Sequence, residues 1–152
     1  MNNKVFKIIM KKALYIFLII ISGMVSAQKN MNTKFAVCND AVGIVKIFSK
    51  DNIEKVNVFK TKANLPSNLK KFDFLAENGL TEIKLKKNAG APDFMPLEML
   101  NDQYGLPKNT TVFIDGYQFD DPKTNIYSEI IMNGKIVESD GKKSLHIFTT
   151  GN

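Results

Sequence analysis

Two side chains in this sequence could support nucleophilic catalysis, and each occurs only once. Cys38 is the only cysteine and His146 the only histidine among 152 residues. A thiol nucleophile needs a base within hydrogen-bond reach, whereas His146 lies inside a run typical of a strand. We therefore predict no Cys38–His146 dyad and expect Cys38 to be a small buried apolar residue. The alternative for Cys38 is a reactive or intermolecular thiol.

The sequence offers few side chains that could bind a metal ion or a cofactor. A zinc site uses three or four Cys, His or carboxylate ligands. With one cysteine and one histidine, the remaining ligands would be Asp or Glu residues, whose spacing in this sequence does not match a zinc motif. The sequence also contains no glycine-rich phosphate-binding loop. We assign no catalytic residue, no metal ligand and no cofactor-binding residue, and we expect no cofactor.

One acidic cluster could form a site, because carboxylates that converge in a loop can bind Ca²⁺. Asp115, Asp120 and Asp121 lie within seven residues of one another, and Gly116 follows the first of them. The cluster lacks the alternate-residue spacing of a calcium loop, and Asp115-Gly116 is typical of a tight turn. We predict a loop or interaction site at these four residues. The alternative is a secreted hydrolase whose carboxylates meet in a pocket.

The positive charge of the chain is concentrated in a leader. The net charge is +6, yet Lys4, Lys7, Lys11 and Lys12 precede any acidic residue. The other 17 basic residues exceed the 15 acidic ones by only two. Such a small excess gives no strong field for phosphate, so we expect no nucleic-acid partner.

Residues 1–27 have the three parts of a secretory signal peptide. Lysines come first, an apolar run from Ala13 to Ile21 follows, and Val25 and Ala27 supply the small residues that precede a cleavage site. The apolar run is shorter than the roughly 20 residues that span a bilayer. We expect cleavage after Ala27, export to the periplasm or beyond the cell, and no stable membrane span afterwards.

Residues 28–152 have the length of one small domain. Their patterns predict an α+β fold: a mainly antiparallel sheet with one or two short helices. Residues 28–34 are polar and are expected to be a frayed end, and residues 118–124 a loop. The predicted strands are residues 43–48, 55–60, 81–86, 111–114, 129–132, 135–138 and 144–149, and residues 93–104 are a predicted helix. Residues 65–78 fit a helix that carries Leu69, Phe72 and Ala76 inward, but Phe72 and Phe74 also fit a strand. The predicted core is Val56, Val58, Ile83, Leu85, Leu100, Phe113, Ile131, Ile136 and Ile147.

The C-terminal part predicts a three-stranded meander. Asn133-Gly134 favours a two-residue type I′ turn that would place Ile131 opposite Ile136, and Asp140-Gly141 favours a second turn. No internal repeat is evident in the sequence. The last strand, through Thr149, is a candidate edge that could accept a partner strand.

Two segments resemble a known family. Residues 51–60 (DNIEKVNVFK) and 78–87 (NGLTEIKLKK) are similar to the plug domain of TonB-dependent outer-membrane receptors, in which "DIESIEVLK" precedes "NGVIxIxTK". Residues 112–116 (VFIDG) resemble the family's "VIDG" strand and turn, although here they follow residues 51–60 instead of preceding them. The family's Leu-Tyr-Gly stretch is missing, and no barrel sequence follows. The resemblance implies a small, exported, plug-like module that contacts another envelope protein and catalyses nothing.

The sequence therefore predicts a non-catalytic binding or accessory module of the cell envelope that acts through protein–protein contact. Its partner would be another envelope or secreted protein. The alternatives are the secreted hydrolase and a secreted inhibitor or immunity-type protein.

Overall fold

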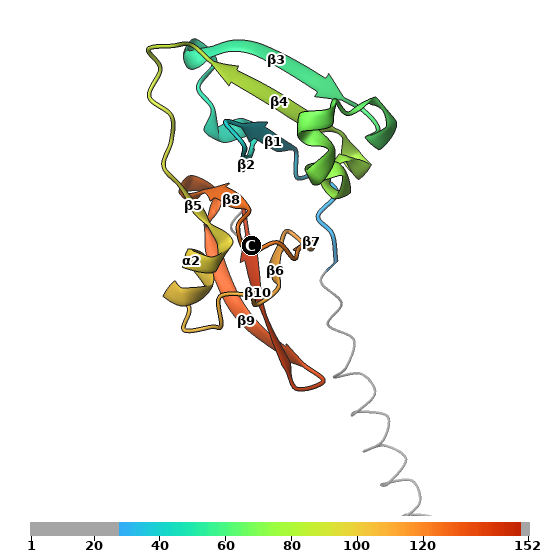
Figure 1. Cartoon of the computed structure of the whole chain (residues 1–152), viewed down its shortest axis with the longest axis vertical. Helices are drawn as coiled ribbons and strands as arrows, with labels where there is room; N and C mark the ends of the chain where they lie inside the picture. Colours follow the sequence, from blue (N-terminus) through green and yellow to red (C-terminus); the bar gives the residue numbers. More distant parts are fainter. Residues whose placement is uncertain (1–27, 150–152) are drawn as a thin grey trace, which may run out of the picture.

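Two β-sheets form the framework of the protein. The computed structural model describes residues 28–149, and the leader predicted at residues 1–27 lies outside the described residues. The six-stranded sheet has the order β3-β4-β1-β2-β8-β5, and the four-stranded sheet has the order β7-β6-β10-β9 (Figure 1). The strands are β1 (Phe35–Cys38), β2 (Ala41–Ile44), β3 (Ile53–Phe59), β4 (Leu80–Leu85), β5 (Phe94–Pro96), β6 (Val112–Ile114), β7 (Tyr117–Phe119), β8 (Asn125–Tyr127), β9 (Asn133–Ser139) and β10 (Lys142–Phe148).

In the part of the chain that the structure describes, helical structure is limited to short segments. Within residues 28–149 the one α-helix is α2 (Leu97–Gln103), and none of their helices combines the length and apolarity that a membrane crossing requires. The remaining segments are 3₁₀ turns: η1 (Val45–Ile47), η2 (Lys50–Asn52), η3 (Lys62–Asn64), η4 (Ser67–Asn78) and η5 (Ser128–Ile130).

One four-stranded topology occurs twice along the chain. In the first unit, the β1–β2 hairpin is followed by the antiparallel pair β3–β4, and β4 returns parallel to β1. In the second unit, the β6–β7 hairpin is followed by the antiparallel pair β9–β10, and β10 returns parallel to β6. The orders β3-β4-β1-β2 and β9-β10-β6-β7 are therefore equivalent. The repeat lies in the topology and not in a sequence period, so the sequence alone does not reveal it.

The registers of the two units also agree. Ala36 lies three residues before the β1–β2 turn and pairs with Thr81 of β4. Val112 lies three residues before the β6–β7 turn and pairs with Leu145 of β10. Each unit thus places its returning strand at the same height beside its hairpin.

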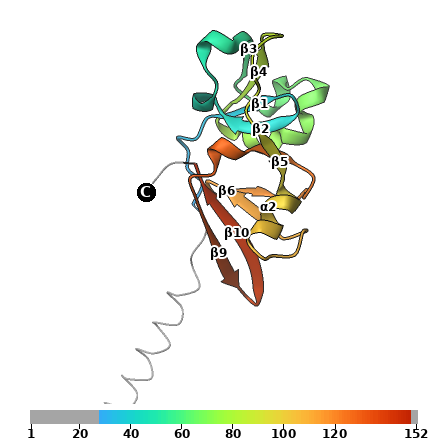
Figure 2. The ribbon, with the colours of Figure 1, turned by 90° about the vertical axis from the view of Figure 1, so that its left-hand side faces the viewer.

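The segment that connects β7 to β9 in the second unit also joins the two units. The segment between β7 and β9 contributes β8, which pairs parallel with β2 of the first unit, and β5 then pairs with the outer side of β8. Figure 2 shows β5 beneath the first unit and α2 beside the β9–β10 pair. One cluster of buried side chains extends through both units.

The α+β prediction is confirmed, with the sheets mixed instead of purely antiparallel. Three strand pairings are parallel: β1 with β4, β2 with β8, and β6 with β10. A parallel pairing needs a crossover connection, which in the first unit runs from β1 through β2 and β3 to β4, and in the second from β6 through β7, β8 and β9 to β10.

The first unit differs from expectation at its start. The sequence missed β1, because Phe35–Cys38 is buried on both faces and has no alternating pattern. The strand predicted at residues 43–48 ends at Ile44, and η1 follows. The turn through η1 brings Ile47 and Phe48 over Gly43, where a Cβ atom would lie 3.0 Å from Ile47 and 3.3 Å from Phe48.

The segment at residues 65–78, for which the sequence left helix and strand open, forms 3₁₀ turns with a kink at Phe72. Its inward residues Leu69, Phe72 and Ala76 are buried, as predicted. The helix predicted at residues 93–104 is shorter, because Phe94–Pro96 pairs with β8 before α2 begins. The loop predicted at residues 118–124 is partly wrong, because β7 includes Gln118 and Phe119.

Two of the three predicted C-terminal strands are present, as β9 and β10, whereas the strand predicted at residues 129–132 is wrong, because the 3₁₀ turn η5 lies there. One of the predicted turns is also wrong. Asn133 and Gly134 lie within β9 and pair with Phe148 and Ile147. Gly134 is needed there for space, since a Cβ atom would collide with the side chain of Tyr104. The turn at Asp140-Gly141 is confirmed by the pairing on either side of it.

The predicted core is right for the central strands and wrong at the edges. Ile83, Leu100 and Ile147 are buried, while Leu85, Phe113 and Ile131 are partly buried. Val56, Val58 and Ile136 are exposed by 49%, 64% and 46%. All three belong to edge strands, β3 and β9, which have a neighbour on one side only. The alternation of apolar and polar residues predicts that the two faces of a strand differ. It does not reveal that the apolar face stays exposed when the strand lies at the edge of its sheet.

Candidate functional site

Asp115, the first residue predicted for a loop site, is a buried structural anchor. It begins the two-residue β6–β7 turn and is only 4% exposed. Its carboxylate accepts hydrogen bonds from the Thr33 hydroxyl at 2.5 Å, the Thr149 hydroxyl at 2.5 Å and the Thr149 backbone N–H at 3.0 Å. These bonds hold both ends of the described chain on one carboxylate, which leaves it engaged within the protein.

Gly116 lies under the N-terminal strap, as we call residues 28–34. Its φ is +81°, and a Cβ atom would lie 2.5 Å from the carbonyl oxygen of Gln28. The backbone N–H of Asn30 donates to the carbonyl of Asp115 at 2.8 Å. The expectation of a frayed end at residues 28–34 is therefore wrong, because the strap is bonded to the β6–β7 turn.

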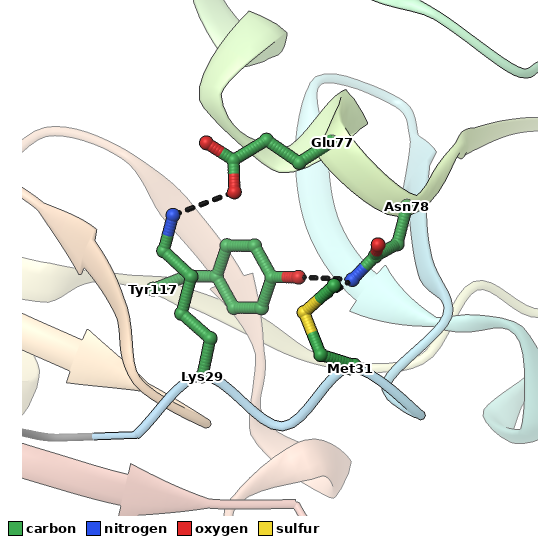
Figure 3. A network of polar contacts seen from close by, with 5 residues as sticks. All are labelled: Lys29, Met31, Glu77, Asn78 and Tyr117. Atoms are coloured by element: carbon green, nitrogen blue, oxygen red, sulfur yellow. Dashed lines mark hydrogen bonds and ion pairs between the residues drawn. The ribbon is translucent and has the colours of Figure 1, made fainter.

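The strap also contacts the first unit (Figure 3). The Lys29 ammonium pairs with Glu77 at 2.6 Å, and this hydrogen bond lowers the pKa of the Glu77 carboxyl. The Asn78 amide donates to the Tyr117 hydroxyl at 2.7 Å and lies 3.2 Å from the sulfur of Met31. The strap, η4 and β7 meet here, so these contacts stabilise the arrangement of the two units.

Asp120 and Asp121 lie apart from this anchor, on the surface. The Asp120 carboxylate accepts from the Gln118 amide at 2.8 Å, and that of Asp121 accepts from the Lys123 backbone N–H at 2.9 Å. Both aspartates line a cleft of about 280 Å³ beside η4, whose lining does not include Asp115. Across residues 28–149, no three Cys, His, Asp or Glu side chains gather as a metal site would require. The four predicted residues thus divide into a buried anchor and an exposed turn.

Cys38 is buried in β1, with 1% exposure. Burial raises the pKa of its thiol, an effect partly offset by the hydrogen bond with Tyr127. The Tyr127 hydroxyl donates to the Cys38 carbonyl at 2.9 Å, and burial raises the pKa of this phenol as well. A neutral, covered thiol is a poor nucleophile.

His146 lies in the second sheet, with partners of its own. Its Nε2 atom is 3.0 Å from the Ser144 hydroxyl, and its ring stacks on Phe113 at a centroid distance of 4.7 Å. Burial lowers the pKa of the imidazole, and the positive charge of Lys135 lowers it further. Among the described hydrogen bonds none joins this imidazole to a carboxylate, so the orienting member of a Ser-His-Asp arrangement is not in place. The two-residue spacing of Ser144 and His146 on a predicted strand could have revealed this pair.

The most exposed apolar feature with free backbone groups is the edge of β3. This strand has seven residues and pairs only with β4 among the described strands. Val56 and Val58 project from it into solvent, and an open groove of about 740 Å³ runs along Val56–Phe59 beside η3. An edge strand of this length can accept a further strand through its free N–H and C=O groups. The sequence missed this site because it assigned both valines to the core.

The last strand is not such an edge. β10 lies between β6 and β9, so its backbone is paired on both sides. The Thr149 N–H is bonded to Asp115. The hypothesis that the strand through Thr149 accepts a partner is wrong, because the topological repeat places β10 in the middle of its sheet.

Comparison with known proteins gave no relative. No protein-family model, no curated protein and no solved structure matches the chain.

Proposed function

We propose that this protein is an exported, non-catalytic binding module of the cell envelope, and that the free edge of β3 is its docking strand. The single observation that carries the proposal is the seven-residue edge strand with Val56 and Val58 exposed on one face. The partner is an envelope or secreted protein, a second copy of this chain included, bound through strand addition.

The backbone of β3 supports this mode of binding. β3 is held on β4 by a ladder from Lys55 to Phe59, so its outer N–H and C=O groups are fixed in the geometry that an added strand needs. Burying the two valine side chains under a partner would add an apolar gain of roughly 1.5–3 kcal/mol for each fully covered valine.

The envelope setting rests on the sequence. The leader at residues 1–27 has the composition of a signal peptide, and β3 and β4 carry the two segments that resemble a receptor plug domain. Their antiparallel pairing is compatible with that resemblance. A plug-like accessory would work by contact, which agrees with the positions of Cys38, His146 and the aspartates.

The test is a capture experiment with an edge-blocked variant. The full-length sequence is expressed with a C-terminal tag and used as bait against detergent-solubilised envelope from the source cell, with mass spectrometry as the readout. The variant Val56→Lys/Val58→Lys places two charges where the partner strand would lie. We expect it to lose at least tenfold of a protein that the unaltered bait retains.

Ile136→Lys is the matched control, because Ile136 is an exposed apolar residue on the other long edge strand, β9. It should retain the same protein as the unaltered bait. Equal retention by the edge-blocked variant, or a folded bait that retains no protein and no second copy of this chain, would refute the proposal.

A further inference from the structure

We infer that the strand that docks on β3 is β3 of a second copy of this chain, antiparallel to the first and related to it by a two-fold axis at Asn57. This inference rests on the proposed function, since it names the partner of the same edge. A two-fold interface uses one surface twice, so its residues must complement themselves. The order of side chains along β3 meets that condition.

The regular part of the free edge is symmetric about Asn57. The ladder with β4 shifts register between Ile53 and Lys55, which leaves a bulge at Glu54, and β3 ends at Phe59. The straight segment is therefore Lys55–Phe59, whose central residue is Asn57. A two-fold axis at this position uses the whole segment and places no charged residue opposite its own copy.

The solvent-facing valines complement each other in this register. Val56 of one copy lies opposite Val58 of the second copy, and the reverse pair follows by symmetry. Both are β-branched and exposed, by 49% and 64%, and cross-strand pairs of this kind stabilise antiparallel sheets. The dimer thus places the two apolar side chains that the single chain exposes in lateral contact with each other.

The charged residues of the β3 edge also lie next to residues of the second copy with which they interact favourably. Glu54 of one copy lies opposite Lys60 of the second copy, just beyond each end of the straight segment, and both side chains are exposed. Lys55 lies opposite Phe59 of the second copy, a pairing of an ammonium with an aromatic ring that is favourable when the two are in contact. Glu54 now pairs with Lys84 of its own chain at 3.1 Å, and that exposed contact is weak enough to be shared.

Neighbouring registers lack this match. An axis at Lys55 places two lysines opposite each other, which is repulsive. An axis at Val56 places Glu54 opposite Val58, and an axis at Val58 places Val56 opposite Lys60. Only the axis at Asn57 joins opposite charges and the two valines at once.

Variants that exchange the charges of Glu54 and Lys60 test the register directly. In the variant Glu54→Lys, and separately in Lys60→Glu, like charges meet at both ends of the interface. In the double variant Glu54→Lys/Lys60→Glu, opposite charges meet again. We expect the unaltered protein to sediment with twice the monomer mass, each single variant to raise the dissociation constant at least tenfold, and the double variant to recover most of the loss.

Glu138→Lys on β9 is the control, because it changes an exposed charge on the equivalent edge strand outside the interface. It should leave the dimer unchanged. A monomer at all concentrations that still captures a different protein through β3 would overturn the second copy as partner and leave the proposed function intact. A monomer that captures nothing would overturn both. A dimer that ignores the single variants, or is not restored by the double variant, would overturn the register.

Discussion

At the scale of single residues, the Asp115 carboxylate links two segments that are far apart in the sequence, at Thr33 and Thr149. It is buried and accepts three hydrogen bonds from Thr33 and Thr149. We predict that Asp115→Asn lowers the free energy of unfolding by about 2 kcal/mol, because the amide nitrogen cannot accept from these donors. Asparagine tolerates the positive φ of 48°, so the turn itself is preserved.

The control for this variant is Asp140→Asn. Asp140 has the same place in the β9–β10 turn, with a φ of 51°, and its side chain is exposed. Urea unfolding should therefore show a change within about 0.5 kcal/mol for Asp140→Asn, as is usual at surface sites. Equal losses in the two variants would mean that the Asp115 carboxylate does not act as an anchor.

Protonation of His146 makes the stability of the folded protein depend on pH. Burial and Lys135 lower the pKa of its imidazole in the folded protein, so the unfolded chain takes up a proton at a higher pH than the folded one. The contribution is fully present above the unfolded pKa of about 6.5 and is lost as the pH falls through the folded pKa. We predict that Tm falls between pH 7.5 and pH 5.5, and that His146→Gln reduces this fall.

The chain has one histidine, so other imidazoles do not titrate in this range. Ser144→Ala removes the hydroxyl 3.0 Å from Nε2 but keeps the imidazole, and it should retain the pH dependence. Differential scanning calorimetry across the range would measure both. An unchanged slope in His146→Gln would contradict the assignment.

At the scale of elements, the two-residue turns at Asn39-Asp40, Asp115-Gly116 and Asp140-Gly141 close the hairpins β1–β2, β6–β7 and β9–β10. All six residues have positive φ, as type I′ turns require. Gly116 has a further constraint, the strap that crosses it. We predict that Gly116→Ala costs more stability than Gly141→Ala, which has a similar φ of +72° but open space around its Cβ position.

Thermal unfolding of both glycine variants would check this. Gly141→Ala reports the backbone cost alone, about 1 kcal/mol. Gly116→Ala adds a collision with the backbone of Gln28 at 2.5 Å, which must displace the strap. A Gly116→Ala loss no greater than that of Gly141→Ala would show that the strap does not rest on the turn in solution.

These elements also show what sequence patterns can and cannot predict. The strands around Val56 and Ile83 and the turn at Asp140-Gly141 follow from alternation and turn chemistry, which are local. The Asn133-Gly134 turn was predicted by the same local rule and is wrong, because Gly134 makes room for Tyr104, a distant neighbour. The β3 edge site was missed for a similar reason: whether Val58 is covered depends on which strand lies beside it.

At the scale of the whole molecule, the two units share one core. Phe35 of the first unit contacts Tyr117 and Phe119 of the second, at centroid distances of 5.1 Å and 6.4 Å. Phe74 of η4 contacts Phe119 at 5.0 Å, and the Tyr127 hydroxyl bonds the Cys38 carbonyl. With β8 of the second unit hydrogen-bonded into the first sheet, neither unit can open without exposing apolar surface of the other.

We therefore predict that a change in one unit weakens both. Phe35→Leu should lower stability by about 1–2 kcal/mol, since it removes buried ring atoms, and should reduce hydrogen-exchange protection in β10 as much as in β4. Phe94→Leu is the matched control, because Phe94 is 48% exposed and should leave protection in both strands nearly unchanged. Exchange measured by mass spectrometry on peptides from the two sheets separates the possibilities. Loss of protection in β4 alone would mean that the repeated units unfold independently, whereas equal loss in β4 and β10 follows if the contacts of Phe35 with β7 couple the two sheets.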